Sequence, residues 1–329
     1  MTDINELLSR LNPKIAERFR IASEISPQFQ RLPSLGLNRA LQGGMRYGST
    51  AVVWGNRSAG KTASLIQMIG NAQKDSRGVA WIDAEKQFDP AWARRLGADP
   101  DQILVSPINS VADMADAGVD MLRANVDILV IDSISSLLSN AYFDDGEIKD
   151  FAKTGQIGTL SKNLGSAATM LNAMNKDTLI IYISQVRNQF GSMHASLVPM
   201  GGKAMEHIPS TIIKLWSSFA QDDQIYGDIS DGDLIFKEPI GRKVTWTIGK
   251  SRGKGEGMTG SYDFYFNGDH VGVDNVAETL DLAVMYGKVK KGGAWYTIYD
   301  ERLQGGKKAT AYLRSNPEIL EKLEQELNA

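Results

Sequence analysis

Between a predicted strand and a predicted helix lies a glycine-containing turn with the residues of a phosphate-binding loop. It matches the pattern Gly-x-x-x-x-Gly-Lys-Ser/Thr in full, with Gly55, Asn56, Arg57, Ser58, Ala59, Gly60, Lys61 and Thr62. The glycines let the backbone curl so that its N–H groups face phosphate oxygens at a helix start. Lys61 would neutralise the β- and γ-phosphates, and the Thr62 hydroxyl would bind Mg²⁺. The segment predicts a site for ATP and Mg²⁺; the alternative is a chance glycine-rich turn.

Two carboxylates would complete a hydrolytic site. Asp132 follows the apolar run Asp127–Ile131 and would hold Mg²⁺ through water. The alternative role for Asp132 is a helix cap for a segment beginning at Ser133. Glu85 follows the predicted strand Gly78–Ile82, and neighbouring parallel strands end at the same edge of a sheet. Glu85 is therefore the best-placed group to activate water, although such a residue alone is more often a surface acid.

A mostly parallel sheet would bring these residues together, and the chain has the pattern of one. Short apolar runs alternate with amphipathic segments, which predicts an α/β fold with helices on both sheet faces. The predicted strands are Thr50–Trp54, Gly78–Ile82, Ile103–Val105, Asp127–Ile131 and Thr178–Ser184. The predicted helices are Thr62–Gln73, Pro90–Leu96, Val111–Arg123 and Gln156–Asn175.

The two ends of the chain differ from this central region. A short helical arm is predicted before Pro33, and strands that extend the sheet are predicted at Thr211–Trp216, Lys243–Ile248 and Ser261–Phe266. The C-terminal unit would contain the helices Val276–Tyr286 and Asn316–Leu327 around the aromatic turn Gly293–Tyr299. We expect three parts: an arm at 1–32, an ATPase core at 33–270, and a small α+β C-terminal domain at 271–329.

Composition limits the partners of the protein. The 329 residues include no cysteine, which excludes disulfides and thiolate metal sites, and only three histidines, which argues against a zinc enzyme. Neither a signal peptide nor a membrane-spanning segment is apparent, so we expect a cytoplasmic protein without a membrane partner. The net charge is −3, so a polynucleotide would have to bind at local basic patches such as 237–254 and 288–314.

Outside the phosphate loop, the chain resembles the RecA recombinases, especially the bacteriophage recombinases of the T-even (UvsX-like) type. The resemblance runs from Pro33 to Leu327. It is carried by Leu35–Leu41, Gly43–Met45, Asp83–Glu85, Asp89–Gly97, Ile181–Arg187, Lys250–Arg252, Gly293–Tyr296 and Ala309–Glu318. It implies the RecA-like P-loop ATPase core, with a twisted and mostly parallel sheet.

The resemblance also implies roles around the nucleotide. Glu85 would be the general base for the attacking water, and Gln185 would sense the γ-phosphate and switch the loop that follows it. Trp92 would stack on adenine, and Asp89 would accept a hydrogen bond from the adenine amino group. Without the resemblance, Trp92 would be interpreted as a core aromatic residue.

Further implied sites concern DNA and the neighbouring copy. The second DNA-binding loop would span Asn188–Ala204, with contacts from Arg187, Phe190, Gly191, Met193, Gly201, Gly202 and Lys203. Phe190 is the candidate wedge between bases. Lys250 and Arg252 would reach the ATP of the next protomer; a solvated basic hairpin is the alternative.

One acidic segment fits the resemblance poorly. The first DNA-binding loop would fall around Asn140–Gln156, where Asp144, Asp145 and Glu147 would repel phosphates. A nuclease site is one reading of these acids, and a solvated loop is the other. Arg57 also departs from the family, which often has an acid or a small polar residue there, and the N-terminal arm shows little detailed likeness.

These features predict an ATP-driven recombinase that assembles as a helical filament on single-stranded DNA and pairs it with homologous double-stranded DNA. A ring-shaped hexameric helicase of the same fold is one alternative. A weakly catalytic ATP-binding recombination mediator is another. Single-strand-binding and loader proteins are conceivable partners, and the phage likeness suggests work in a bacterial host cytoplasm.

Overall fold

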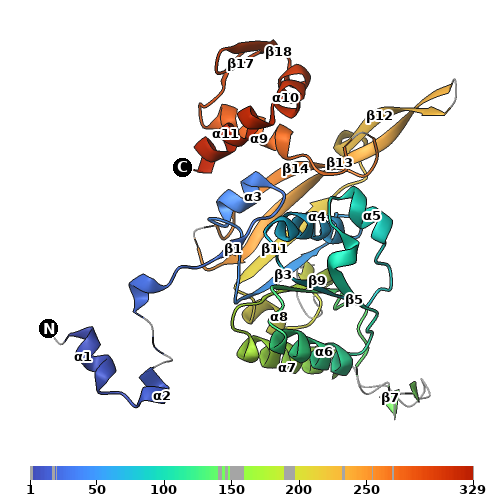
Figure 1. Ribbon diagram of the computed structural model, residues 1–329. Coiled ribbons are helices and arrows are strands. Elements are labelled where there is room, and N and C mark those ends of the chain that lie inside the picture. Colours follow the sequence, from blue (N-terminus) through green and yellow to red (C-terminus); the bar gives the residue numbers. More distant parts are fainter. Residues whose placement is uncertain are drawn as a thin grey trace.

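The computed structural model describes residues 3–16, 19, 21–139, 143–144, 147–148, 159–188, 197–231, 234–253, 255–268 and 270–328. Within these residues the dominant feature is an 11-stranded sheet (Figure 1). Its parallel part has the order β11-β3-β9-β6-β4-β5. The strands are β3 (Thr50–Gly55), β4 (Val79–Asp83), β5 (Ile103–Ser106), β6 (Ile128–Asp132), β9 (Leu179–Asn188) and β11 (Thr211–Ser217). This arrangement confirms the predicted RecA-like α/β fold.

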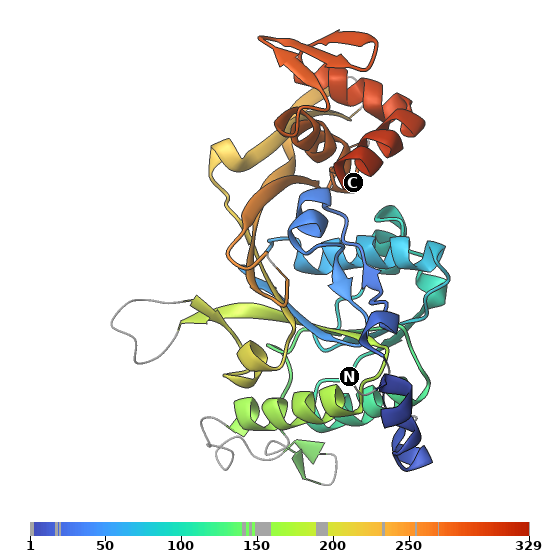
Figure 2. The same cartoon turned by 90° about the vertical axis from the view of Figure 1, so that its left-hand side faces the viewer.

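Helices cover both faces of the parallel strands, and the strand sequences show why. Alternate residues of β3 enter different cores: Val53 packs in the core beneath α4, and Val52 in the core beneath α6 and α7. Since both faces are buried, the strands are continuous apolar runs. Figure 2 shows α4 and the green helices α6 and α7 on opposite sides of the sheet. The covering helices are α4 (Lys61–Lys74), α5 (Pro90–Arg95), α6 (Val111–Arg123), α7 (Thr159–Met174) and α8 (Ala204–His207).

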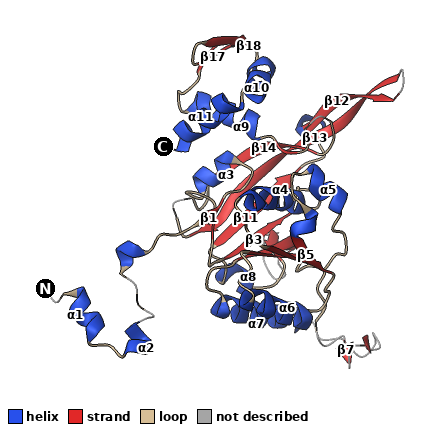
Figure 3. Ribbon diagram, in the orientation of Figure 1, coloured by secondary structure: helices blue, strands red, loops and turns tan. Residues whose placement is uncertain are grey.

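Beyond β11 the sheet continues with antiparallel strands. These are β13 (Leu234–Ser251), β14 (Thr259–Tyr265) and β15 (Gly272–Val273), while β12 (Gln224–Asp231) pairs with β13 alone. The β12–β13 hairpin extends beyond the body of the sheet (Figure 3). The predicted strand Lys243–Ile248 thus covers only part of β13, and β12 was not predicted. The outer part of the hairpin carries Lys237, Glu238 and Pro239 in a solvent-exposed ladder, so it lacks the apolar runs of a buried strand.

The C-terminal region forms a smaller core of its own. Helices α9 (Asn275–Met285), α10 (Gly306–Ser315) and α11 (Pro317–Asn328) pack around Leu280 and Leu313. A three-stranded sheet lies beside them: β16 (Lys290–Gly292), β17 (Trp295–Ile298) and β18 (Glu301–Gln304). The predicted aromatic turn is therefore the strand β17 with its flanking turns, and helix α10 was not predicted.

A buried carboxylate joins this region to the core. Glu278 of α9 accepts hydrogen bonds from the Ser34 hydroxyl and the Leu35 backbone N–H, both at 2.7 Å. These donors begin the helix α3 (Leu35–Ala40). A Cβ on Gly36 would lie 2.8 Å from Glu278 Oε1, so a larger residue there would displace the carboxylate. Burial raises the pKa of Glu278 to about 7.

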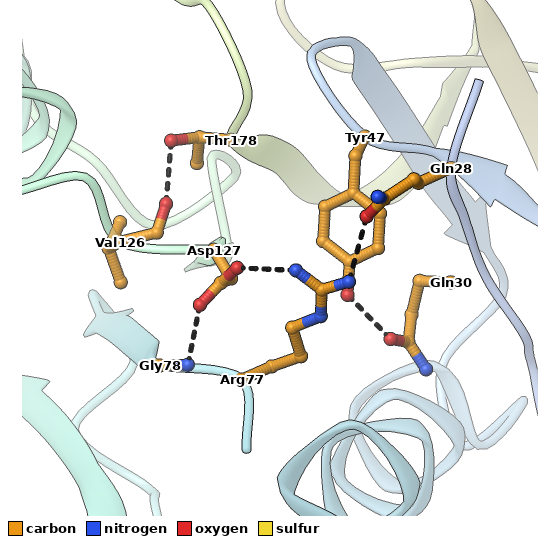
Figure 4. Close-up of polar contacts among 8 residues, drawn as sticks. All are labelled: Gln28, Gln30, Tyr47, Arg77, Gly78, Val126, Asp127 and Thr178. Atoms are coloured by element: carbon orange, nitrogen blue, oxygen red, sulfur yellow. Dashed lines mark hydrogen bonds and ion pairs between the residues drawn. The ribbon is translucent and has the colours of Figure 1, made fainter. Parts of the chain in front are cut away.

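The N-terminal segment enters the core at the amino edge of the sheet (Figure 4). The Arg77 guanidinium donates to Asp127 Oδ1 and to Gln28 Oε1, both at 2.9 Å, and lies 4.7 Å from the centre of the Tyr47 ring. The Tyr47 hydroxyl donates to Gln30 Oε1 at 2.7 Å. These contacts fix the root of the arm. The arm itself contains α1 (Ile4–Ser9) and α2 (Pro13–Ala16), and residues 29–30 and 45–46 pair as β1 and β2.

Candidate active site

The side chains predicted to act on a nucleotide meet in a cleft of about 550 Å³ at the carboxyl edge of the parallel strands. Strand register explains the meeting, because Gly55 pairs with Gln185 and Asp83 pairs with Asp132. The predicted residues that line the cleft are Arg57, Ser58, Gly60, Lys61, Thr62, Glu85, Trp92, Asp132 and Gln185. The same strand ends therefore bring together the phosphate loop, Glu85, Asp132 and Gln185.

The phosphate loop needs its glycines for two different reasons. A Cβ on Gly55 would lie 1.7 Å from the Leu215 carbonyl oxygen, so only glycine fits against β11. Gly60 has φ 76°, a left-handed conformation that glycine adopts without strain, and it leads directly into α4. The resulting turn lays the backbone across the start of a 14-residue helix, where phosphate binds favourably.

Lys61 is held inside this turn. It is buried, and its Nζ donates to the carbonyl oxygens of Gly55 at 3.2 Å and Asn56 at 2.9 Å. Burial lowers the pKa of Lys61, and the nearby Asp132 and Glu85 carboxylates oppose that shift. The ammonium group is thus positioned beside the phosphate-binding turn before any ligand arrives.

A contact that sequence reasoning missed fixes the turn to β11. The Asn56 side chain donates to the Ser217 carbonyl at 2.6 Å and accepts from the Ser217 N–H at 3.1 Å. The Ser217 hydroxyl also donates to the Ser58 carbonyl at 3.2 Å. The two residues that flank Arg57 are therefore both anchored to the end of one strand. The sequence alone gives no signal for a contact between residues so far apart.

The predicted Mg²⁺ ligands lie side by side. The Thr62 hydroxyl donates to Asp132 Oδ2 at 2.8 Å. Asp132 is only 7% exposed, and burial raises its pKa to about 7, against the opposing effect of the Thr62 hydrogen bond. A divalent cation would offset the desolvation of this carboxylate, and carboxylate and hydroxyl oxygens are ligands suited to Mg²⁺. Thr62 and Asp132 therefore supply oxygen ligands that suit Mg²⁺. The alternative helix-cap role of Asp132 is wrong, because residues 133–135 form a turn.

Glu85 and Gln185 are in direct contact. Gln185 Nε2 donates to Glu85 Oε1 at 3.2 Å. The Ser133 hydroxyl donates to the same oxygen at 2.5 Å, and the Ser136 hydroxyl lies 3.4 Å from it. The serine hydroxyls were missed, although a serine-rich run directly after Asp132 was a visible signal. The carboxylate is thereby oriented toward the cleft beside the amide expected to sense phosphate.

The two residues predicted to bind adenine are placed differently. Trp92 is half-buried and lines the cleft, with the Arg95 guanidinium 5.1 Å from its ring centre. Asp89 is exposed and caps α5, accepting from the Ala91 N–H at 2.8 Å. Asp89 is not among the residues that line the cleft. The buried Asp83, which was not singled out, orders the intervening loop by accepting from the Phe88 N–H at 2.8 Å.

The root of the predicted second DNA-binding loop is a hairpin that begins beside the cleft. Strand β9 ends four residues later than predicted, and β10 (Leu197–Pro199) pairs back on it, with Val198 opposite Arg187. The Met200 N–H donates to the Ser184 hydroxyl at 2.8 Å. Gly201 and Gly202 then turn the chain, with φ values of 105° and 71°. The exposed Lys203 follows them, and α8 begins at the next residue.

Several predicted DNA contacts cannot be placed. Phe190, Gly191 and Met193 lie outside the described residues, and for Arg187 the structure describes only the backbone. Asp145 also lies outside them, while Asp144 and Glu147 are described only as backbone in the paired segments β7 (Phe143–Asp144) and β8 (Glu147–Ile148). The expectations for the first loop and for a nuclease site therefore remain predictions.

Lys250 and Arg252 lie far from the cleft of their own chain. Ser251 pairs with Thr211, which pairs with Ala51 near the start of β3, whereas the phosphate loop follows the end of that strand. Four strand residues span about 13 Å. Neither side chain lines the cleft, and the Lys250 Nζ donates to the backbone carbonyls of Glu206 at 3.0 Å and His207 at 2.7 Å. These basic groups are thus at the opposite edge of the sheet.

Across the described part of the chain, no helix has the length and apolar content needed to span a membrane.

Comparison with known proteins gives consistent matches. The sequence matches the RecA N-terminal domain over residues 22–229 and the RecA C-terminal domain over residues 277–329. Protein RecA from Nitrobacter winogradskyi is 32% identical over 295 residues, which are 88% of this chain and 76% of that protein. Protein RecA from Fusobacterium nucleatum is 30% identical over 314 residues, 94% of this chain and 78% of the relative. Protein RecA from Frankia alni is 29% identical over 316 residues, which are 94% of this chain and 86% of that protein.

Proposed function

The chain belongs to the RecA family, and we propose that it is a DNA-dependent ATPase that assembles on single-stranded DNA and promotes homologous pairing and strand exchange. The observation that carries the proposal is the 3.2 Å contact between Gln185 and Glu85 in the cleft. Gln185 lies on β9, which continues into the hairpin below the predicted DNA-binding loop. The presence or loss of the γ-phosphate would therefore change the position of that loop through movement of strand β9.

The hydrolytic roles follow from the cleft. Glu85 would accept a proton from the attacking water, with Ser133 holding the carboxylate in position. Lys61 and the N–H groups of the loop would bind the phosphate oxygens. Thr62 and, through water, Asp132 would hold Mg²⁺, which when bound would neutralise part of the phosphate charge. Trp92 would cover the adenine base, and Asp89, at the start of α5, would accept a hydrogen bond from the adenine amino group.

Coupling to DNA would depend on Gln185. With triphosphate bound, its amide would turn from Glu85 to the γ-phosphate, and hydrolysis would return it. Because Ser184 anchors Met200 across the hairpin, a displacement at Gln185 would move both sides of the loop root. The loop residues Arg187, Phe190, Gly191, Met193, Gly201, Gly202 and Lys203 would contact the DNA backbone and the spaced bases, without sequence preference.

A second copy would complete the site. The position of Lys250 and Arg252 at the far edge of the sheet supports a role toward a neighbouring protomer, because they have no path to their own cleft. Lys250 would have to leave the carbonyls of α8 to reach the neighbour's phosphates. The arm at 1–32 would pack on the adjacent copy, giving a helical filament.

The biological setting is also part of the proposal. The substrates of the protein would be single-stranded DNA and homologous double-stranded DNA. It would act in a bacterial cytoplasm, together with single-strand-binding and loader proteins. The origin in a phage, predicted from the likeness to T-even-type recombinases, stays a prediction, because the relatives described above are bacterial RecA proteins. Electron micrographs with an ATP analogue and single-stranded DNA separate the forms: continuous helical filaments support the recombinase, and discrete rings support a helicase-like motor.

The coupling is tested by DNA affinity in three nucleotide states. Wild type should bind a single-stranded oligonucleotide at least tenfold more tightly with a non-hydrolysable ATP analogue than with ADP or no nucleotide. Gln185→Ala should bind both nucleotides but lose that difference. Ser136→Ala, which removes a weaker 3.4 Å contact in the same network, should retain it. Equal DNA affinity of the wild type in all three states would refute the proposal.

A further inference from the structure

The third residue of the phosphate loop is an arginine whose side chain has no part in the functions described above. Arg57 lines the nucleotide cleft, and Lys61 is the one other cationic residue among the described residues that line it. The same cleft holds the carboxylates Glu85 and Asp132. Lys61 is held against the loop carbonyls, whereas Arg57 makes no such contact and is a second cation that can move toward a ligand.

The backbone at Arg57 is held, while its side chain is not. Asn56 and Ser58, on either side, are both tied to Ser217 by hydrogen bonds of 2.6 to 3.2 Å. Arg57 itself is exposed. Within the described part of the chain, its guanidinium has no hydrogen-bond or ion-pair partner. An arginine with a fixed Cα and an unengaged head group can reorient toward a bound phosphate without breaking an existing contact.

We propose that Arg57 is a same-chain catalytic arginine that binds the terminal phosphate of ATP and stabilises its charge during hydrolysis. The proposal rests on the ATPase function proposed above. The guanidinium fork matches two phosphate oxygens at once, and it cannot lose its proton at physiological pH. Negative charge spreads over the equatorial oxygens as the terminal phosphoryl group is transferred, so a second cation beside Lys61 lowers the barrier.

The location gives Arg57 a role distinct from that of Lys250 and Arg252. Those two groups can reach a cleft only from another copy, because they lie at the far edge of their own sheet. Arg57 is present in each cleft before assembly. It therefore discriminates triphosphate from diphosphate in the isolated protomer, and it supplies a basal turnover that assembly increases.

The test separates binding from turnover. In a Glu85→Gln background, which blocks hydrolysis, we measure the affinity of the monomeric protein for a non-hydrolysable ATP analogue and for ADP. Arg57→Ala should weaken analogue binding about tenfold while changing ADP binding less than about threefold, and Arg57→Lys should lie between. With Glu85 restored, Arg57→Ala should lower the turnover of assembled protein by about 10²-fold. Arg123→Ala, which removes an exposed arginine of α6 outside the cleft, should match the wild type in both assays.

Three results would overturn the proposal. One is equal loss of affinity for the analogue and ADP, and another is no loss for either. The third is weaker assembly with unchanged turnover per assembled protomer, which would make Arg57 a contact to the neighbouring copy. Lys61→Ala is measured in parallel: if that variant still binds and hydrolyses ATP, the proposed ATPase function itself fails. Thermal unfolding of each variant confirms that the loop change leaves the fold intact.

Discussion

At the level of single residues, the cleft combines two carboxylates with one buried ammonium group and several hydroxyl donors. Asp132 is paired with Thr62, and Glu85 accepts from Ser133 and Gln185. The carboxylates therefore differ in their surroundings: burial raises the pKa of Asp132 to about 7, an effect that a bound cation would offset, while Glu85 is held by orienting donors. Different environments for two acids are what a metal ligand and a general base require.

The Glu85 network leads to a graded prediction for turnover. Glu85→Gln should lower DNA-stimulated ATP turnover by about 10²- to 10⁴-fold while ATP still binds, because the proton acceptor is lost. Ser133→Ala should lower turnover about tenfold, since its 2.5 Å hydrogen bond positions the carboxylate. Ser136→Ala removes only the 3.4 Å contact and should have the smallest effect. Steady-state kinetics in parallel give the order, and an effect of Ser136→Ala equal to that of Ser133→Ala would contradict the positioning role.

The sequence was most informative where a residue belongs to a spaced motif or follows a predicted strand. Lys61 and Thr62 were predicted from the loop pattern, Asp132 and Glu85 from their positions after strands, and Gln185 from the resemblance to RecA recombinases; the structure brings all five into one cleft. The serines that orient Glu85, and the Asn56–Ser217 contact, could not be predicted in the same way. A hydroxyl or amide has many suitable partners, and the fold alone decides which one it meets.

Among the elements, β9 connects the cleft with the loop expected to bind DNA. The strand passes Gln185 and continues into the β9–β10 hairpin, and Gly201 then turns the chain toward α8. A Cβ on Gly201 would lie 2.5 Å from Met205 Cγ and 3.0 Å from Leu164 Cδ2. The turn at Gly201 is therefore closely packed.

The Gly201 turn can be tested against a glycine of similar backbone conformation. Gly201→Ala should lower the free energy of unfolding by about 2–4 kcal/mol, because it adds a steric clash to the strain of a positive φ. Gly257→Ala has the same kind of strain, at φ 83°, but nothing lies within 4 Å of its Cβ. It should cost only about 1 kcal/mol. Urea unfolding of the two variants makes the comparison, and equal costs would show that packing at Gly201 contributes nothing.

The α3–α9 contact makes a prediction about pH. The pKa of Glu278 is about 7 in the folded protein because of burial, above its usual value of 4.5. Between these pH values the unfolded chain loses the proton that the folded protein keeps, so stability falls as pH rises through this window and then levels off. Glu278→Gln imitates the protonated acid and should reduce the loss between about pH 5 and pH 8 by about 1–3 kcal/mol.

The pH measurement is urea unfolding of wild type and Glu278→Gln at several pH values. Asp132 titrates in both proteins, so the difference between the two curves isolates Glu278. Parallel curves would mean that Glu278 does not hold a proton in the folded protein.

Prediction of elements succeeded for the buried parallel strands and failed for the exposed periphery. Helix α6 was predicted at its observed bounds, and β3 to within one residue, because burial imposes an apolar periodicity. Strand β12, the outer half of β13 and helix α10 were missed. In the two strands much of the hairpin meets solvent, so the pattern of apolar residues is weak, whereas α10 is amphipathic and buries Ala309 and Leu313.

For the whole molecule, the decisive feature is that the cleft and the basic pair occupy opposite edges of the sheet. A test by mixing follows. Protomers with Lys61→Ala and protomers with Lys250→Glu and Arg252→Glu should each be nearly inactive alone. In an equal mixture, interfaces that join an intact loop to an intact basic pair should restore roughly a quarter of wild-type turnover. If mixed assemblies showed no restored turnover, the phosphate loop and the basic pair would have to act within the same chain.

With the shared site proposed above, any open row of copies would have two unequal ends. At one end a phosphate loop would lack the lysine and arginine of a neighbour, and at the other end a lysine and an arginine would have no nucleotide to reach. A row of n copies then contains n − 1 finished sites, whereas a closed circle contains n. Short rows would hydrolyse less ATP per copy than long rows. Copies would be added or lost at different rates at the two ends.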